Sequence, residues 1–467
     1  MVVALLIVAG LTILVWWMVK DPVADFTESM PGTDNRVSQA DSVQEVVHIG
    51  EHFESFAEVP DALTESWPRF RGKDFDNVSK SPVKLVDGFN GKAPEILWTH
   101  EMGEGHAGPA IYKGAVYVLD YDEEKRADML RCFSLANGQE CWRRWYRVNV
   151  KRNHGMSRTV PAVTELYILT IGPRAHVMCL DREDGDLLWG LDIEKEYGTE
   201  IPFWYTGQCP LIDDGKAILA TGGKAMLIAV DCASGEVLWE VPNDMGWKMS
   251  HSSIMPFTFG GRRMYVYSAV GGVMGVAADG PDEGSLLWSN AEWNHSVVAP
   301  SPVCLPDGKI FLTAGYGAGS MVLQLSVKEG RFTTKVLQEY EPKDGLASEQ
   351  QTPLVFQDHI LAVLPKDAAT LRNQLVCVRP DDCTDIIWSS GKTSRFGLGP
   401  YMMADGKIFL LSDDGTLTII RPSIRQYIQL DQVKVFDGHD AWAPMAIADG
   451  YMVLRDSKWM ICIQIKA

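Results

Sequence analysis

The chain has 467 residues, of which 46% are hydrophobic, so it is long enough to bury a large core. Its formal net charge is −18, and the sequence contains no basic run. Because affinity for nucleic acid depends on neutralising phosphates, this balance argues against a nucleic-acid-binding protein, and equally against binding to anionic lipid surfaces.

The first predicted element is a membrane anchor over residues 1–20. Residues 2–19 are apolar and uncharged, which is the short end of the length of a membrane-spanning helix. Trp16 and Trp17 lie at its C-terminal edge, where aromatic residues favour the membrane interface. A cleaved signal peptide is the alternative, but no basic residue precedes the apolar run. We expect a single pass through the inner membrane, with the remaining chain in the periplasm.

Residues 21–66 form the next predicted segment, an acidic linker. It contains eleven acidic residues and a single base, Arg36. An excess of like charge is typical of a solvated tether, in which one short helix is expected around Val43–Phe56. Residues 67–94 are expected to form an N-terminal extension that packs on the folded domain, which spans residues 95–467.

A repeated motif decides the expected fold. The pattern Gly-x-x-x-Trp recurs at Gly138–Trp142, Gly185–Trp189, Gly235–Trp239 and Gly284–Trp288. The tryptophans are 47, 50 and 49 residues apart, and Trp388 follows two periods later. Short apolar runs bounded by Gly and Asp precede each tryptophan, which is the pattern of β-strands. Four short strands in each unit of about 40–50 residues are typical of a β-propeller blade.

The repeats predict an all-β protein, an eight-bladed β-propeller with four-stranded antiparallel blades. Residues 445–466 supply only three strands of the last unit, and the segment Glu95–Trp98 supplies the missing outer strand, so the two ends of the domain close the ring. Closure removes exposed sheet edges. Each tryptophan is expected to pack between adjacent blades, and the outer strands are centred on Trp98, Trp142, Trp189, Trp239, Trp288, Val336, Trp388 and Leu430.

These repeats resemble those of PQQ-like β-propellers, a superfamily that includes quinoprotein alcohol dehydrogenases and the outer-membrane barrel-assembly lipoprotein. Further matching motifs occur at residues 67–72 (Trp-Pro-Arg-Phe-Arg-Gly), 397–401 and 442–446. The resemblance covers residues 67–467. It implies the fold, whereas activity has to be argued from a site.

The dehydrogenases of that superfamily carry a disulfide between adjacent cysteines, a calcium site and an Asp base. No two of the nine cysteines here are adjacent, and no residue trio matches the calcium and base positions, so no catalytic residue and no metal ligand is predicted. PQQ with Ca²⁺ stays open as a cofactor. Cys179 and Cys462 lie in apolar strands and are expected in the core. Cross-hairpin disulfides stay open for two pairs, Cys132 with Cys141 and Cys377 with Cys383.

One group of polar and aromatic residues is predicted to face the channel mouth, because residues just before the first strand of each blade line that mouth in a propeller. Histidine and arginine side chains there are suited to an anionic ligand, including a quinone that carries carboxylates, and aromatic side chains are suited to a flat ring. The predicted cofactor-binding residues are His106, Arg158, Gln208, His251, His295, Gln351, Tyr401 and Trp442.

The function expected from the sequence is a non-catalytic binding or scaffold module, held at the membrane and acting on envelope or membrane proteins. Four tryptophans between the repeats are expected to pack locally, and exposure would instead make them suitable as partner anchors: Trp145, Trp204, Trp247 and Trp293. The alternative is a PQQ-dependent dehydrogenase that oxidises an alcohol-type substrate.

Overall fold

The structure is a computed structural model that describes residues 10–17, 46–59 and 63–467. It divides into two units, residues 1–46 and 47–467. In the first unit, residues 10–17 are helical. The rest of the predicted anchor, and the linker up to residue 45, lie outside the described residues. Within the described ranges, no helix has both the length and the apolar character needed to cross a bilayer.

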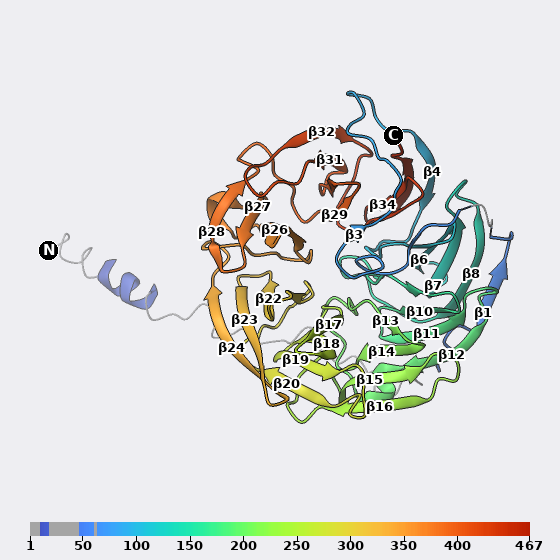
Figure 1. Cartoon of the computed structure of the whole chain (residues 1–467), viewed down its shortest axis with the longest axis horizontal. Coiled ribbons are helices and arrows are strands. Elements are labelled where there is room, and N and C mark those ends of the chain that lie inside the picture. Colours follow the sequence, from blue (N-terminus) through green and yellow to red (C-terminus); the bar gives the residue numbers. More distant parts are fainter. Residues whose placement is uncertain (1–9, 18–45, 60–62) are drawn as a thin grey trace. The chain divides into compact units, whose positions relative to one another are not determined.

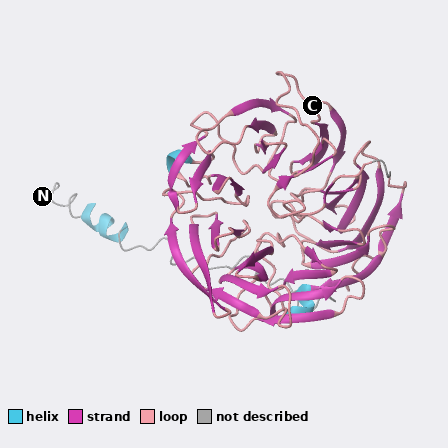
Figure 2. Cartoon of the chain, viewed as in Figure 1, coloured by secondary structure: helices cyan, strands magenta, loops and turns pink. Residues whose placement is uncertain are grey.

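The second unit is a ring of eight sheets arranged around a common centre (Figure 1), and nearly all its regular structure is strand (Figure 2). This confirms the predicted eight-bladed propeller. The short helices among its described residues are α2 (Ile193–Tyr197) and a 3-10 turn at Ala369–Leu371. Each blade has four strands, of which the fourth is outermost.

Blades 1 to 4 contain β5–β8 (Ala110–Tyr112, Ala115–Asp122, Ala127–Ser134, Glu140–Arg147), β9–β12 (Ala162–Val163, Tyr167–Ile171, His176–Asp181, Leu187–Asp192), β13–β16 (Leu211–Asp213, Lys216–Ala220, Ala225–Asp231, Val237–Pro242) and β17–β20 (Met255–Phe259, Arg262–Ala269, Gly272–Ala277, Leu286–Asn290). Blades 5 to 7 contain β21–β24 (Val303–Cys304, Lys309–Ala314, Gly319–Lys328, Arg331–Tyr340), β25–β28 (Leu354–Phe356, His359–Val363, Leu375–Arg379, Asp382–Ser389) and β29–β32 (Tyr401–Ala404, Lys407–Leu411, Thr416–Ile420, Gln429–Lys434).

Blade 8 closes the ring as the repeat count predicts. Its first three strands come from the C-terminus and its outer strand from the N-terminal side: β33 (Ala446–Ala448), β34 (Tyr451–Arg455), β35 (Trp459–Gln464) and β4 (Ile96–Glu101). β4 pairs antiparallel with β35, and Cys462 lies opposite Trp98. The buried guanidinium of Arg455 adds a second fastening, because it donates to the carbonyl oxygens of Ala107 and Leu119 in and before blade 1, at 3.2 and 3.1 Å.

The repeated tryptophans form contacts between blades, as predicted. A Cβ atom on Gly138 of blade 1 would lie 2.5 Å from the Trp98 ring of blade 8, so only glycine leaves room for the indole. The indole NH of Trp98 donates to the carbonyl oxygen of Leu135 at 2.8 Å. The same arrangement repeats at Trp189, whose indole NH donates to Cys232 of the next blade at 2.9 Å. In the Gly-x-x-x-Trp motif, the glycine therefore makes room for the indole of the preceding blade, and the tryptophan packs against the glycine of the next blade.

The position opposite each tryptophan on the adjacent strand is small. Strand pairing places Cys132, Cys179, Ala229, Gly275, Cys377 and Cys462 opposite Trp142, Trp189, Trp239, Trp288, Trp388 and Trp98. A Cβ on Gly275 would lie 2.2 Å from the Trp288 indole nitrogen, which shows why larger residues are excluded. Four of the nine cysteines thus serve as small core residues. All nine are free thiols, so neither cross-hairpin disulfide is formed.

The segment before the propeller adds a fifth strand to the outer edge of blade 1. β1 (His52–Ser55) pairs antiparallel with β8, which corrects the short helix expected there. The Trp145 indole donates to Glu54 at 3.1 Å, and the Arg144 guanidinium lies 4.6 Å from the centre of the Phe53 ring. Residues 47–59, which their composition assigned to the linker, are therefore bound to the outer strand of blade 1 by strand pairing, an ion pair and aromatic contacts.

The Trp-Pro-Arg-Phe-Arg-Gly motif fastens the extension across the inner ends of several blades. β2 (Ser66–Trp67) pairs with β5 of blade 1, and β3 (Val78–Ser79) runs parallel to β29 of blade 7. Between them, Arg69 donates to the carbonyl oxygen of Ile212 in blade 3 at 3.1 Å. Arg71 is buried and donates to the carbonyl oxygen of Thr352, before blade 6, at 3.0 Å. This segment crosses the central channel (Figure 1).

Candidate functional site

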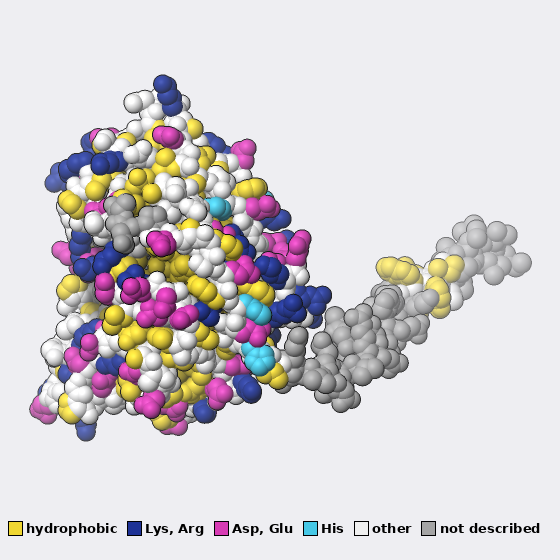
Figure 3. All heavy atoms as spheres, turned by 90° about the vertical axis from the view of Figure 1, so that its right-hand side faces the viewer, with side chains coloured by type: hydrophobic (Ala, Val, Ile, Leu, Met, Phe, Trp, Pro, Cys, Tyr) yellow, Lys and Arg dark blue, Asp and Glu magenta, His cyan; other side chains and the backbone are white. Residues whose placement is uncertain are grey.

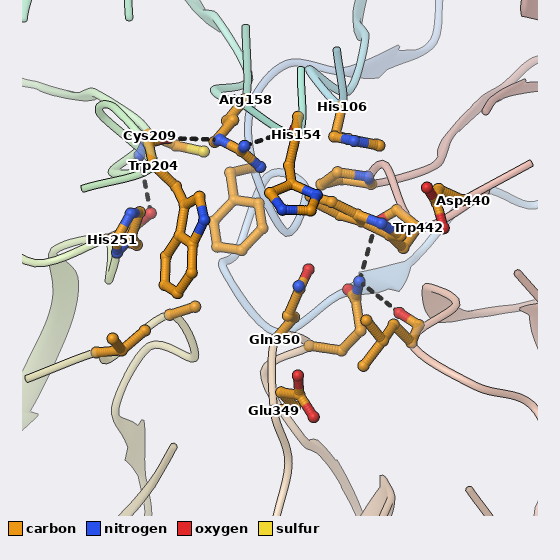
Figure 4. Close-up of a pocket in the computed structure, with 18 of the residues that line it drawn as sticks. His106, His154, Arg158, Trp204, Cys209, His251, Glu349, Gln350, Asp440 and Trp442 are labelled. Carbon is orange, nitrogen blue, oxygen red and sulfur yellow. Dashed lines mark hydrogen bonds between the residues drawn. The ribbon is translucent and has the colours of Figure 1, made fainter. Parts of the chain in front are cut away.

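The candidate site is a cavity of about 300 Å³ at the centre of the propeller. Such a volume is at the lower end of the range for small-molecule sites. Phe70, from the segment that crosses the channel, forms part of its wall. Figure 4 shows Trp204 and Trp442 on two sides of the cavity, Arg158 and His154 near one end, and Glu349 and Gln350 toward the other.

Arg158 is a half-buried cation without an acidic partner among the described residues. It lies just before β9, and three main-chain carbonyls hold its side chain: Nε donates to Trp204 at 2.6 Å, and Nη2 donates to His154 and Asn153 at 2.6 and 3.0 Å. Burial lowers its pKa to about 10, so it is still charged at neutral pH. Its Nη1 makes no hydrogen bond to the described residues and is left for an acceptor in the cavity.

Two histidines next to Arg158 are neutral. Burial, followed by the charge of Arg158, lowers the pKa of His251 to about 4 and that of His106 well below its ordinary value. The Nδ1 of His106 and the Nε2 of His251 are buried and have no hydrogen-bond partner in the described part of the chain. The two rings therefore add hydrogen-bonding atoms to the cavity without adding charge.

Aromatic rings form much of the remaining wall. The ring of His106 stacks on Trp442 with centroids 3.6 Å apart, and Trp204 stacks on Tyr316 at 5.4 Å. The Arg158 guanidinium lies 5.7 Å from the centre of the Trp442 ring, an attractive cation–π distance. These contacts fix the orientation of the rings before any ligand arrives.

The other end of the cavity is acidic. The Glu349 side chain is only 3% exposed, its Oε2 has no hydrogen-bond partner among the described residues, and burial raises its pKa. Lys366, which is 70% exposed, lies 3.9 Å from the other oxygen of Glu349. Asp440 also lines the cavity. A ligand would thus meet one unpaired cation at one end and two acidic side chains elsewhere. Within the described ranges, no group of three metal-binding side chains occurs.

The structure brings together part of the predicted set. Those that line the cavity are His106, Arg158, His251, Gln351 and Trp442. The Gln351 amide is engaged by the carbonyl oxygens of Leu398 and Trp442, so it braces the wall.

Gln208, His295 and Tyr401 do not line the cavity, and their spacing from the first strand accounts for two of these cases. The five predicted residues that line the cavity lie three or four positions before the first strand of their blade. His295 lies eight positions before β21 and packs against Trp293 instead, while Ala299 lines the cavity. Tyr401 is the first residue of β29, and Leu398 takes the lining position. Gln208 has the right spacing, but its amide donates to the carbonyl oxygen of Ala220 and does not face the cavity. Its chain neighbours Gly207 and Cys209 line the cavity instead.

Several lining residues were missed because they come from loops outside the position just before a first strand. Trp204 and Glu349 lie in long connections between blades, whereas Tyr316 and Lys366 lie in loops inside blades 5 and 6. The sequence offered one indication of Trp204 as a lining residue, namely the three consecutive aromatic residues of Phe203–Tyr205 in a loop. Of the four tryptophans between the repeats, Trp145, Trp247 and Trp293 are buried, which fits local packing and not a partner anchor, and Trp204 lines the cavity.

Comparison with known proteins agrees with this architecture. The family model described as outer membrane protein assembly factor BamB matches residues 126–382. No curated protein matches the chain.

Among solved structures, the chain is similar to BamB from Moraxella catarrhalis, with 11% identity over 80% of this chain and 100% of that chain, and a TM-score of 0.51. A europium-containing methanol dehydrogenase shows 11% identity over 83% and 89% of the two chains, with a TM-score of 0.57. A quinohemoprotein alcohol dehydrogenase from Comamonas testosteroni shows 11% identity over 86% and 81%, also with a TM-score of 0.57. These structural likenesses show the fold alone. Because the family match spans more than half of the residues, this chain belongs to the PQQ-like propeller family described as outer membrane protein assembly factor BamB.

Proposed function

We propose that this protein is a non-catalytic binding module, tethered to the inner membrane by its N-terminal segment, whose propeller holds envelope proteins in the periplasm. The family match over residues 126–382 carries the proposal, since that family is described by an assembly factor for outer membrane proteins. The apolar residues 2–19 and the acidic stretch after them support the tether.

The outer wall of the propeller supports a specific mode of binding. In blade 1 it already accepts an extended segment, because β1 pairs with the edge of β8. Among the described residues, the outer strands of the other blades have no such fifth strand. Those strands carry apolar side chains that are partly open to solvent, including Leu238 at 49% and Leu286 at 45% exposure. On the wall that Figure 3 shows, hydrophobic side chains likewise lie between charged ones. The occupant we propose is an extended strand of an envelope protein, held by main-chain pairing and apolar contacts.

Site-specific photocrosslinking tests this mode in native membranes. A benzophenone amino acid at position 238 or 286 of the full-length chain is expected to capture the same envelope proteins. Leu166 provides the matched control, because it is a leucine with 60% exposure in the turn between β9 and β10, away from the outer strands. Equal capture at all three positions, or none at 238 and 286, would contradict the proposal. Retention in membranes after alkaline washing tests the tether separately.

A PQQ-dependent dehydrogenase is the second candidate, favoured by the unpaired Arg158 and the aromatic walls of the cavity. The charges argue against it. PQQ carries three carboxylates, whereas the cavity offers one cation free of acidic partners and is also lined by Glu349 and Asp440. We therefore find that the residues present do not fit this cofactor.

Reconstitution decides between the two candidates. The purified full-length protein is titrated with PQQ and Ca²⁺, and absorbance and dye-linked alcohol oxidation are followed. We expect neither a spectral change at micromolar PQQ nor turnover. Stoichiometric binding with turnover would replace the binding-module proposal by the enzyme.

A further inference from the structure

We infer that the central cavity binds a flat organic acid with a single carboxylate, such as a hydroxylated aromatic monocarboxylate. This ligand site is separate from the outer wall and does not depend on the proposed function. Three features carry the inference: the unpaired Arg158, the aromatic walls and the acidic far end.

The carboxylate belongs at Arg158. Three main-chain carbonyls take up the hydrogens on Nε and Nη2, which fixes the guanidinium and leaves Nη1 directed to the cavity. Hydrogen bonds between ionised partners are shorter and roughly twice as strong as neutral ones. Arg158 is half-buried and has no acidic partner in the described part of the chain, so its guanidinium can pair with a ligand carboxylate. The unpartnered ring nitrogens of His106 and His251 line the same cavity, and each donates or accepts a hydrogen bond according to its tautomer.

A flat ring matches the walls. Trp204 and Trp442 lie on two sides of the cavity (Figure 4), and both are held by stacking contacts, with Tyr316 and His106 respectively. Rigid aromatic surfaces favour planar ligands because offset stacking and edge contacts require little reorganisation.

The far end rejects a second negative charge. Glu349 is buried, its Oε2 lacks a hydrogen-bond partner in the described part of the chain, and Asp440 lines the same cavity. A neutral hydroxyl can donate to the Glu349 oxygen, whereas a second carboxylate there would be repelled. Hence the cavity selects one carboxylate with a neutral polar group opposite it.

Titration calorimetry on the wild-type full-length protein tests this without any variant. The probe is 4-hydroxybenzoate, with tryptophan fluorescence as a second readout. Its uncharged amide, 4-hydroxybenzamide, is expected to bind at least about tenfold more weakly, because a hydrogen bond to a charged group contributes about 1.5–3 kcal/mol. Terephthalate, which has a second carboxylate, and cyclohexanecarboxylate, which is not flat, are also expected to bind at least about tenfold more weakly.

Two variants locate the site. Arg158→Gln is expected to reduce the affinity for 4-hydroxybenzoate at least about tenfold and to abolish the preference over the amide. Arg152→Gln is the matched control, since Arg152 is 71% exposed and paired with Glu104 at the neighbouring surface. Glu349→Gln should reduce the discrimination against terephthalate. If Arg158→Gln does not fold, the inference is still tested by the binding of the four probes to the wild type and by Glu349→Gln.

The inference is overturned if acid and amide bind equally, if terephthalate binds as tightly as 4-hydroxybenzoate, or if no probe binds at millimolar concentration. It is also overturned if folded Arg158→Gln binds the acid as the wild type does.

Discussion

The indole of Trp98, on the N-terminal strand β4, lies opposite Cys462 on the C-terminal strand β35 and donates to the carbonyl oxygen of Leu135 in blade 1 at 2.8 Å. One side chain therefore takes part both in the sheet that closes the ring and in the contact with the next blade. Its 7% exposure shows that the joint is nearly sealed from water.

Replacing this side chain should weaken the ring at its closure. We expect Trp98→Ala to lower the free energy of unfolding by about 3–5 kcal/mol, as deletion of large buried aromatic side chains does. Urea unfolding followed by circular dichroism measures the change. Trp459→Ala is the control on the paired strand, because Trp459 is 44% exposed and should be tolerated. A loss below about 1 kcal/mol for Trp98→Ala would show that the joint does not depend on the indole.

Removing Arg71 should destabilise the segment that crosses the channel. Its guanidinium donates to the carbonyl oxygens of Phe75, Thr352 and Pro353, so Arg71→Ala leaves buried acceptors unpaired. Each such group costs about 1–3 kcal/mol. We expect a clear fall in the thermal midpoint and faster proteolysis within residues 67–79. Arg425→Ala, at an exposed site, should leave both unchanged. Equal behaviour of the two variants would contradict this role.

Asp128 should make stability depend on pH. Burial raises its pKa to about 7, although the Tyr146 hydroxyl donates to it at 2.8 Å. In the unfolded chain the group titrates at about 3.9. Between about pH 4 and pH 7 the folded state holds a proton that the unfolded state has lost. The contribution of Asp128 to the free energy of unfolding is therefore fully present below about pH 4 and is lost as the pH rises through 7.

The variant Asp128→Asn should remove that part of the pH dependence. The amide oxygen still accepts from Tyr146, so we expect a higher thermal midpoint than wild type at pH 8 and a smaller difference at pH 5. Asp244→Asn, at an exposed carboxyl, is the control. The idea fails if the difference between Asp128→Asn and wild type is the same at both pH values.

Reversing the charge of Glu54 should release β1 from the outer wall. Its carboxylate accepts from the Trp145 indole and lies 3.6 Å from the Arg143 guanidinium, so Glu54→Lys replaces attraction by repulsion. Hydrogen exchange at the amides of Phe56 and Ala57, which donate to Cys141, is expected to accelerate at least about tenfold, the ratio for about 1.4 kcal/mol.

The control for β1 is Glu51→Lys. Glu51 has the same 38% side-chain exposure, and its carboxylate lies 3.0 Å from the His52 ring inside the same segment. Exchange at Phe56 and Ala57 should stay near the wild-type rate in this variant. Similar acceleration in both variants would mean that general charge, and not the contact with Trp145 and Arg143, holds the strand.

The sequence alone determined the eight blades, the strand that closes them and the contacts of the repeated tryptophans. This was achievable because the period of about 48 residues and the glycine four positions before Trp142, Trp189, Trp239 and Trp288 are local patterns with one packing solution. The sequence also placed Arg158, His106, His251 and Trp442 at the channel, since all four lie four positions before the first strand of their blade.

Only the tertiary structure decided the rest. His295 and Tyr401 were misplaced because connections of unequal length shift the register, and Glu349 and Trp204 were missed because they come from such connections. The pairing of β1 with β8 and the lack of an acid beside Arg158 depend on residues more than forty positions apart in the chain. Short-range sequence patterns carry no information on these contacts between distant residues, because the contacts form only when the ring closes and brings distant loops together at its axis.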